Sequence, residues 1–369
     1  MSDASEFACN GGRLRAAVIG TGKISEEHLR FLSQSPAVEL AAVCDLSPSL
    51  ARYAVARFRG GQAFTRSGQM LAEVRPDVVH VLTPPHTHVP LVSECIDAGA
   101  HVIVEKPLAL TNREFHELWE LSRARGRRLV EDHNYRFNEP ILEIERLMRR
   151  GRLGEVREVE VRMSLAVLAE GDRFTDENLP HPSHKLPAGV IHEFITHLCY
   201  LTLRFMPTYD HVAVSWAKYG DNPLFKYDDL DALLLGGGAH GRIRFSAHTA
   251  PDVFSVTVRG SKGWAETDLF QPHVRATLPR PVGRQLTPLA NHFLAGCGLV
   301  RASVAGFRNK VMQKTPYEGL HRFLNQTYAA LRNGTEPPVT FEDMDRTSKL
   351  VDALLNAENR ICGSESHAS

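Results

Sequence analysis

The first third of the chain alternates short apolar runs with segments of helical periodicity. Each apolar run is typical of a buried strand, and the segment after it places apolar residues three or four positions apart, as one face of a helix requires. The predicted strands are 14–19, 38–44, 78–82, 101–104 and one that begins at 128, and the predicted helices are 24–33, 48–58, 89–98 and 111–125. Strands that alternate with helices indicate βαβ units and a parallel sheet.

The pattern changes after Asn134. A further helix is predicted over 140–150, and from residue 155 onward most apolar runs alternate with polar residues, which is typical of half-buried strands. The predicted strands are 155–163, 213–219, 232–235, 242–248, 254–259 and 264–269, and the predicted helices are 188–204, 317–332 and 341–359. Because most of these strands follow one another without a helical crossover, they are expected to be mostly antiparallel. Residues 280–315 receive no assignment.

The chain is expected to form two domains, because 369 residues are too many for one small domain. The change of pattern places the first domain over 13–134, with a parallel sheet. The second domain spans 135–362 and carries a mainly antiparallel sheet, so the fold class is α/β. Residues 1–12 and 363–369 are polar and are expected to be flexible termini.

Composition narrows the class of protein. Hydrophobic residues make up 43% of the chain, so a large core can be buried and wholesale disorder is excluded. Lys and Arg number 43, as do Asp and Glu. The zero net charge argues against a nucleic-acid binder with a general basic surface and against a polybasic membrane anchor. The six cysteines are scattered without a C-x-x-C pair, which argues against a disulfide framework and a thiolate metal site.

Targeting and membrane signals are not expected from the pattern. The first twelve residues are polar and have no apolar signal core. The most apolar late stretch, 286–307, carries Pro288, His292 and Arg301, so no membrane span is predicted and a cytoplasmic location is expected. The basic and apolar run 286–314 suits a lid, an oligomer contact or a surface-binding segment, and the sequence leaves these alternatives open.

The sharpest chemical signal is a glycine turn between the first predicted strand and the first predicted helix. The residues of the turn are Gly20, Thr21, Gly22, Lys23 and Ile24. Gly20 permits the tight turn, Gly22 lets a pyrophosphate approach the backbone, and the N-terminus of the helix favours its negative charge. Ser25, in the place of a third glycine, is small enough for close helix packing. The turn therefore predicts that the first domain is a Rossmann dinucleotide-binding domain.

Asp45 closes the second predicted strand, roughly 20 residues after the turn. A carboxylate in this place can accept hydrogen bonds from ribose hydroxyls, whereas it would repel a 2′-phosphate. No Arg directly follows Asp45, so NAD is favoured over NADP as the cofactor. The alternative is that Asp45 caps the N-terminus of the helix that begins at Pro48.

Polar residues also follow the third and fourth predicted strands. Thr83 and Pro84 follow one, with His88 close behind, and Glu105 and Lys106 follow the other. Ligands of open α/β sheets bind at these carboxyl ends of the strands. A charged Glu-Lys pair beyond a buried strand is costly unless it is paired or functional. The pair is therefore either part of a solvated loop or places a Lys ammonium over nicotinamide, where it hydrogen-bonds a substrate hydroxyl.

Together these motifs resemble the Gfo/Idh/MocA family, the glucose–fructose oxidoreductase and inositol dehydrogenase group. The matching residues are Gly20-x-Gly22, Asp45, Thr83-Pro84-x-x-x-His88, Glu105-Lys106-Pro107 and Asn134-x-Arg136. The resemblance covers nearly the whole chain and implies a Rossmann domain followed by an α/β domain with an open, mainly antiparallel sheet. It implies that Thr83, Pro84, His88, Glu105 and Lys106 contact the cofactor. It also implies a homodimer or homotetramer formed through the C-terminal sheet.

The family's second signature resembles residues 187–197, where a glycine-rich helix start is followed by an acidic residue and then by a histidine four residues later. Glu193, which replaces the usual Asp, and His197 fit this spacing and share a helix face. By resemblance, His197 is the general acid or base for a substrate hydroxyl, Lys106 polarises the same oxygen, and Glu193 orients a hydroxyl or tunes the pair. The alternative is a plain surface pair of Glu193 and His197.

Metal catalysis is not expected at this helix, because His192 and His197 are five residues apart and a zinc-protease motif needs four. His192 is instead a candidate substrate-binding residue, together with Tyr135, Arg136 and Tyr317. Arg136 either binds a substrate carboxylate or phosphate or forms an interdomain ion pair.

The sequence therefore predicts an NAD-dependent dehydrogenase or reductase. By resemblance, it transfers hydride between nicotinamide and a secondary alcohol or ketone of a sugar, cyclitol or sugar nucleotide. A rival enzyme would use the same site but recycle its bound NAD, as the family's redox-assisted glycosidases do, or epimerise its substrate. A non-catalytic dinucleotide-binding regulator on the same fold is the third alternative.

Overall fold

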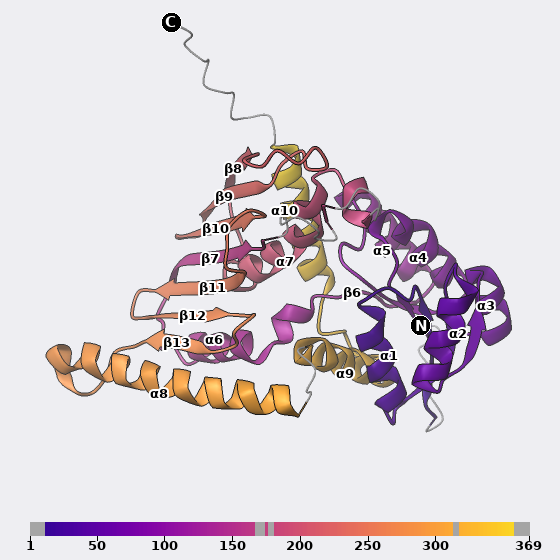
Figure 1. The fold of residues 1–369 in the computed structure, drawn as a ribbon, viewed down its shortest axis with the longest axis horizontal. Helices are drawn as coiled ribbons and strands as arrows, with labels where there is room; N and C mark the ends of the chain where they lie inside the picture. The colour runs from indigo at the N-terminus through magenta and orange to yellow at the C-terminus, as the bar shows by residue number, and fades with distance from the viewer. Residues whose placement is uncertain (1–11, 167–173, 176–180, 313–316, 358–369) are drawn as a thin grey trace, which may run out of the picture. The chain divides into compact units, whose positions relative to one another are not determined.

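The computed structural model describes residues 12–166, 174–175, 181–312 and 317–357, and the chain divides into two compact units (Figure 1). Unit 1 comprises Met1–Phe137 and Tyr317–Ser348, and unit 2 comprises Asn138–Pro316 and Lys349–Ser369. The chain therefore leaves unit 1, builds most of unit 2, and returns to unit 1 near its end.

Unit 1 is built on a six-stranded parallel sheet with the strand order β3-β2-β1-β4-β5-β6. Its first elements are β1 (Leu14–Ile19), α1 (Ser25–Gln34), β2 (Val38–Cys44), α2 (Pro48–Phe58), β3 (Gln62–Phe64), α3 (Ser67–Val74), β4 (Val78–Val81), α4 (His88–Asp97), β5 (His101–Val104), α5 (Asn112–Ala124) and β6 (Leu129–Glu131). This is the doubly wound order of dinucleotide-binding folds, so the predicted Rossmann architecture is confirmed. The short elements β3 and α3 were not anticipated from the pattern.

The central strands of unit 1 are buried because they carry apolar residues on both faces, as parallel strands covered by helices must. All four residues of β4 are buried, and Val78, Val79 and Val81 are fully so. The fourth is His80, an imidazole in an otherwise apolar strand. A buried polar side chain of this kind requires a hydrogen-bonding partner, and His80 has two.

The helix α9 (Glu318–Asn333) completes the core of unit 1, although the sequence analysis assigns it to the second domain. Its apolar residues follow helical spacing, and Leu320, Phe323, Leu324 and Tyr328 join the core cluster that contains β1 and β4. The pattern reveals this apolar face, but it does not reveal which of two sheets the face covers. The compact units therefore divide the chain differently from the predicted domains, of which the second spanned 135–362.

Unit 2 carries a seven-stranded sheet with the order β13-β12-β11-β7-β10-β9-β8. Its strands are β7 (Val156–Ser164), β8 (His211–Ala217), β9 (Asp229–Gly236), β10 (Ala239–Ser246), β11 (Val253–Gly260), β12 (Trp264–Asp268) and β13 (Val274–Thr277). The predicted mainly antiparallel sheet is confirmed. One pair differs, because β7 and β10 are parallel, and α7 (Gly189–Phe205), which packs on both strands, lies between them in the chain.

Three more helices belong wholly or partly to unit 2. They are α6 (Glu139–Arg149), α8 (Gly283–Val311) and the C-terminal part of α10 (Phe341–Asn356). Residues 280–315, which received no assignment, thus contain a 29-residue helix. Asn291 ties α8 to the end of β13, because its Nδ2 donates to the Leu278 carbonyl oxygen at 2.9 Å and its Oδ1 accepts from Arg280 Nε at 2.8 Å. None of the described helices is long and apolar enough to cross a membrane.

Candidate functional site

The glycine turn between β1 and α1 has the geometry that a dinucleotide site requires. Gly20 has a φ of +96°, and a Cβ there would lie 2.8 Å from the Leu82 carbonyl oxygen, so both conformation and packing require glycine. A Cβ at Gly22 would instead meet no protein atom within 4 Å. Packing within the protein therefore does not require glycine at position 22, whereas close approach of a pyrophosphate to the backbone would require it.

Asp45 lies directly beside the glycine turn. Its Oδ2 accepts hydrogen bonds from the Thr21 backbone nitrogen at 2.9 Å and from Thr21 Oγ1 at 2.6 Å, while its Oδ1 accepts from the Ser47 backbone nitrogen at 2.8 Å. Ser47 provides the N-cap of α2, since its Oγ accepts from the Leu50 backbone nitrogen. The alternative of Asp45 as a helix cap is therefore wrong. The carboxylate joins the end of β2 to the turn and retains acceptor capacity for a ribose hydroxyl.

His88 joins the two other loops at this edge of the sheet. Its Nε2 lies 2.7 Å from the Thr83 carbonyl oxygen and its Nδ1 lies 2.8 Å from the Pro107 carbonyl oxygen. The side chain is fully buried, and burial lowers the pKa of His88. His88 therefore fixes the loop that begins with Thr83 and Pro84 against the loop that contains Lys106, and its direct contact with a cofactor remains a prediction.

The loop after β5 is shaped by carboxylates. The Leu108 backbone nitrogen donates to Glu131 Oε1 at 2.7 Å, and the Lys106 backbone nitrogen lies 3.2 Å from Glu105 Oε2. The Lys106–Pro107 peptide bond is cis, and the Lys106 side chain is partly exposed. The predicted Glu-Lys pair is thus held by hydrogen bonds on the protein side, so it is not a simple solvated loop.

Beneath this loop lies a buried ion cluster that the sequence analysis did not predict. His28, on α1, points its Nε2 toward Asp132 Oδ2 at 3.6 Å and Glu105 Oε1 at 3.7 Å. His28 and Asp132 are almost completely buried, and Glu105 is 14% exposed. The three ligand-type atoms lie within 4.8 Å of one another, a spacing that a divalent cation could also bridge.

The electrostatics of the cluster favour a protonated imidazole between the two carboxylates. Burial lowers the pKa of His28, but Asp132 and Glu105 outweigh it and raise that pKa to about 9. Burial raises the pKa of Asp132 to about 6, against the opposing effect of His28. Burial opposes the charge of Glu105 as well, but His28 and Lys106 lower the pKa of Glu105. We therefore interpret the cluster as an ion triad in which the imidazolium supplies the positive charge.

The triad continues into a chain of hydrogen bonds. His28 Nδ1 lies 2.8 Å from His80 Nδ1, and His80 Nε2 lies 2.8 Å from Tyr328 Oη on α9. Burial and the neighbouring His28 lower the pKa of His80 well below its usual value, so His80 is neutral and its Nδ1 accepts the hydrogen bond that His28 Nδ1 donates. His80 is the residue from which this chain could have been predicted, because an imidazole within a buried apolar strand requires a buried hydrogen-bonding partner.

Two of the predicted substrate residues of unit 1, Tyr135 and Arg136, follow β6 in the chain. Arg136 is buried, and its Nη1 lies 3.0 Å from Asp343 Oδ2. Burial would raise the pKa of Asp343, but Arg136 outweighs it and lowers that pKa. Both residues belong to unit 1, so this ion pair is not the interdomain pair that was one alternative for Arg136. Tyr135 and Tyr317, which precedes α9, also belong to unit 1. Burial raises the pKa of Tyr135.

The second predicted group of residues lies on α7 in unit 2. His197 Nδ1 is 2.8 Å from Tyr200 Oη, and both side chains are buried. Glu193 Oε2 lies 3.5 Å from His181 Nδ1, and His192 is fully buried. Tyr200, which the sequence analysis missed, fixes the ring of His197: if His197 donates from Nδ1, then Nε2 carries the lone pair of a general base.

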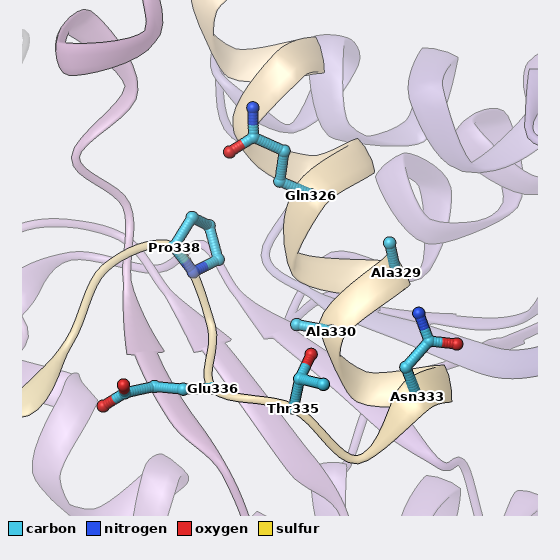
Figure 2. Close-up of a pocket in the computed structure, with 7 residues that line it drawn as sticks. All are labelled: Gln326, Ala329, Ala330, Asn333, Thr335, Glu336 and Pro338. Carbon is cyan, nitrogen blue, oxygen red and sulfur yellow. The ribbon is translucent and has the colours of Figure 1, made fainter.

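Figure 2 shows a pocket of about 270 Å³ at the C-terminal end of α9 and in the loop that follows it. Its polar lining comes from Gln326, Asn333, Thr335 and Glu336. No predicted cofactor or substrate residue lines this pocket. This pocket is therefore a separate feature of unit 1, because its lining includes neither the candidate residues that follow β1, β2, β4, β5 and β6 nor those on α7.

The strand order and the glycine turn define a dinucleotide-binding protein of the Rossmann class. Residues 14–133 match the family model described as an oxidoreductase family with an NAD-binding Rossmann fold. The matching model is that of the Gfo/Idh/MocA family, the family that the motifs in this part of the chain predicted.

Two characterised relatives resemble the first part of the chain. The D-glucoside 3-dehydrogenase of Escherichia coli is 31% identical over 150 residues, which are 40% of this chain and 43% of that protein. Inositol 2-dehydrogenase 1 of Saccharopolyspora erythraea is 32% identical over 146 residues, which are 38% of this chain and 43% of that protein. The chain thus matches less than half the length of either relative.

A solved structure resembles nearly the whole chain. The WlbA dehydrogenase from Bordetella pertussis, in complex with NADH and UDP-GlcNAcA, superposes with a TM-score of 0.72 over 94% of this chain and 96% of that one. The two sequences are 21% identical, so the comparison shows that the fold is shared across both units.

Proposed function

We propose that the protein is an NAD-dependent dehydrogenase or reductase acting on a secondary alcohol or ketone of a sugar, cyclitol or sugar nucleotide. The observation that carries the proposal is the arrangement at one edge of the parallel sheet. The glycine turn, Asp45 and the Glu105-Lys106 pair follow β1, β2 and β5, which are close neighbours in that sheet. The names of the two relatives support the substrate class.

The residues of unit 1 would hold the cofactor and contact the substrate oxygen that reacts. Gly22 and the N-terminus of α1 suit the pyrophosphate, and Asp45 suits the adenosine ribose. Bound NAD supplies the hydride acceptor. Lys106 carries the ammonium that would donate a hydrogen bond to the substrate oxygen, while Glu105 and His28 fix the backbone from which Lys106 projects.

His197 is proposed as the general acid or base for the substrate hydroxyl. Tyr200 holds its Nδ1, so we assign the exchange of a proton with the substrate to the Nε2 atom. Glu193 and its neighbour His181 would orient further hydroxyls of a polyhydroxylated substrate. His192, Tyr135, Arg136 and Tyr317 remain candidates for substrate binding, and Arg136 would have to contact an anion while paired with Asp343.

Turnover assays distinguish the proposed reaction from its rivals. The purified protein is incubated with NAD and a panel of sugars, cyclitols and sugar nucleotides, and NADH absorbance and substrate consumption are both followed. We expect net NADH formation with at least one compound of the panel. Substrate consumption without net NADH would instead support a glycosidase or epimerase that recycles NAD. Cofactor binding without any consumption would support a non-catalytic regulator.

Asp45 is expected to set the preference for NAD over NADP. Replacing Asp45 by asparagine removes a charged acceptor for the ribose and should weaken NAD binding by about tenfold. The same change removes the repulsion of a 2′-phosphate, so the ratio of NADP to NAD affinity should rise. Calorimetric titration of both cofactors tests this, with Asp97→Asn, a surface carboxylate paired with Arg125, as the control. Unchanged affinities in Asp45→Asn would refute this role.

Two expectations about the state of the protein remain proposals. Leu233 and Leu235 are 38% and 45% exposed on β9, and such residues support subunit pairing through the sheet of unit 2. We propose a homodimer or homotetramer on this basis, whereas the cytoplasmic location stays a prediction from the sequence alone.

A further inference from the structure

The helix α8 turns its large apolar side chains away from the sheet of unit 2. Seven of them recur at intervals of three, four or seven residues and are 56–72% exposed: Leu286, Leu289, Phe293, Val300, Val304, Phe307 and Val311. At about 100° per residue they fall within an arc of roughly 60° on the helix. A continuous exposed apolar stripe of this kind marks a surface that something else covers.

The opposite face of α8 carries the small and polar residues, and this face contacts unit 2. Figure 1 shows α8 beside β13, and the two elements are in contact. Asn291 is buried on this face, and Ala295 and Ala302 are half-buried. A Cβ at Gly298 would lie 2.7 Å from the His273 ring, so the helix packs closely there. The arrangement reverses that of an ordinary surface helix, whose large apolar residues face the core.

Charge identifies the kind of surface that the stripe fits. Between Asp268 and Glu318 the sequence contains no acidic residue and seven Lys or Arg residues, in a chain whose net charge is zero. On the helix itself, Arg301 and Arg308 flank one edge of the stripe and Lys310 flanks the other, each about 40–60° beyond it. Cations on both sides of an apolar stripe are the pattern of a helix that lies in the interface of an anionic membrane.

We propose that α8 binds the surface of an anionic lipid bilayer, lying parallel to it. A 29-residue helix is about 43 Å long, so the stripe offers a long line of apolar contacts to the acyl chains. The arginine and lysine side chains at its edges would reach the lipid phosphates. A second copy of α8 fits less well, because paired stripes would bring cationic edges together without an acidic residue to neutralise them.

This inference does not depend on the proposed enzymatic activity. Zero net charge does not exclude such a surface, because positive charge is concentrated near one helix and is balanced by acidic residues elsewhere in the chain. The described residues contain no membrane-spanning helix, so the attachment would be peripheral and reversible.

Vesicle sedimentation with the full-length protein tests the inference. Vesicles of phosphatidylcholine alone are compared with vesicles that contain about one-third phosphatidylglycerol, the source of the negative surface charge. We expect the protein to sediment with the anionic vesicles and to be released by salt. The double variant Phe293→Glu/Phe307→Glu should abolish sedimentation, and Arg301→Gln/Arg308→Gln should weaken it by about thirty-fold.

The control is Tyr219→Glu, which also replaces an exposed aromatic residue by glutamate but lies outside α8, and it should leave vesicle binding unchanged. Circular dichroism establishes that each variant is folded, and the substituted side chains are exposed, so little loss of stability is expected. Absence of wild-type binding to anionic vesicles overturns the proposal. The proposal is also overturned if the wild type forms a stable oligomer and does not bind vesicles, and if Phe293→Glu/Phe307→Glu dissociates that oligomer. A second copy of the chain would then cover the stripe.

Discussion

Replacing Lys106 by alanine is expected to lower kcat by about 10²- to 10⁴-fold, the range typical of a lost acid–base or polarising group. The reason is that the ammonium would donate its hydrogen bond to an oxygen whose charge changes during hydride transfer. NAD affinity should change little, because Gly22, Asp45 and the N-terminus of α1 carry most of the cofactor binding. Steady-state kinetics with a substrate from the panel, together with NAD titration, measure both quantities.

Lys23 provides the matched control for this experiment. It lies in the glycine turn, so Lys23→Ala should weaken NAD binding without a comparable loss of kcat. A Lys106→Arg variant keeps the charge but changes its geometry and should recover part of the activity at most. Full turnover in Lys106→Ala would remove Lys106 from the mechanism, whatever the substrate proves to be.

Replacing His28 by glutamine is expected to destabilise the protein by about 3–5 kcal/mol, because it leaves Asp132 and Glu105 without their buried cation. Thermal unfolding measures this loss as a lower Tm. The matched control is His116→Gln, which removes a histidine from an ion pair with Asp345 whose imidazole is 41% exposed. Because this imidazole is exposed to solvent while that of His28 is fully buried, the control should lower the Tm much less than His28→Gln does.

The same cluster predicts how stability depends on pH. Because the pKa of His28 is raised to about 9, its charge stabilises the fold fully below about pH 6.5, and this stabilisation is lost as the pH rises through about 9. Burial also raises the pKa values of the Cys95 and Cys199 thiols, which adds a loss of stability in alkali that all variants share. The difference between wild type and His28→Gln should therefore shrink from pH 6.5 to 9.

Two further measurements separate an imidazolium from a metal ion in the triad. Adding Asp132→Asn to His28→Gln removes a charge that has lost its partner, so the double variant should be more stable than His28→Gln alone. Treatment of the wild type with a chelator should leave its Tm unchanged. A Tm that falls on chelation would show that the three side chains hold a cation instead. Equal Tm values for His28→Gln and wild type would refute the ion triad altogether.

Much of the fold could be predicted because the short strands of unit 1 are apolar runs that alternate with helices of clear helical periodicity. The predicted helix 111–125 corresponds to α5, and its N-terminus carries a capping box formed by Thr111 and Glu114. The elements that the sequence analysis did not predict have a weak hydrophobic pattern, or they turn their apolar face away from the sheet. The short strands β3 and β13 lack the run of branched apolar residues that marks the equally short β4 and β5. In α8 the large apolar residues face away from the sheet, so the pattern does not indicate where the helix packs.

The candidate site could be predicted only where one short motif carries the chemistry. Gly20, Gly22, Asp45 and Lys106 each stand at a strand end, and strand ends can be located from the sequence. His28 was missed because its function depends on Glu105 and Asp132, which follow two other strands and come close to α1 only in the folded unit. Tyr328 was missed for the same reason, since it reaches His80 from a helix near the end of the chain.

The late return of the chain to unit 1 affects how the protein can be synthesised. When residues up to Phe137 have left the ribosome, the parallel sheet still lacks α9 and the buried side chains Phe323 and Tyr328. All of the chain between Asn138 and Pro316 must be made before those side chains exist. The nascent cofactor domain therefore exposes apolar surface during most of translation, and its completion waits for a segment that follows the entire sheet of unit 2.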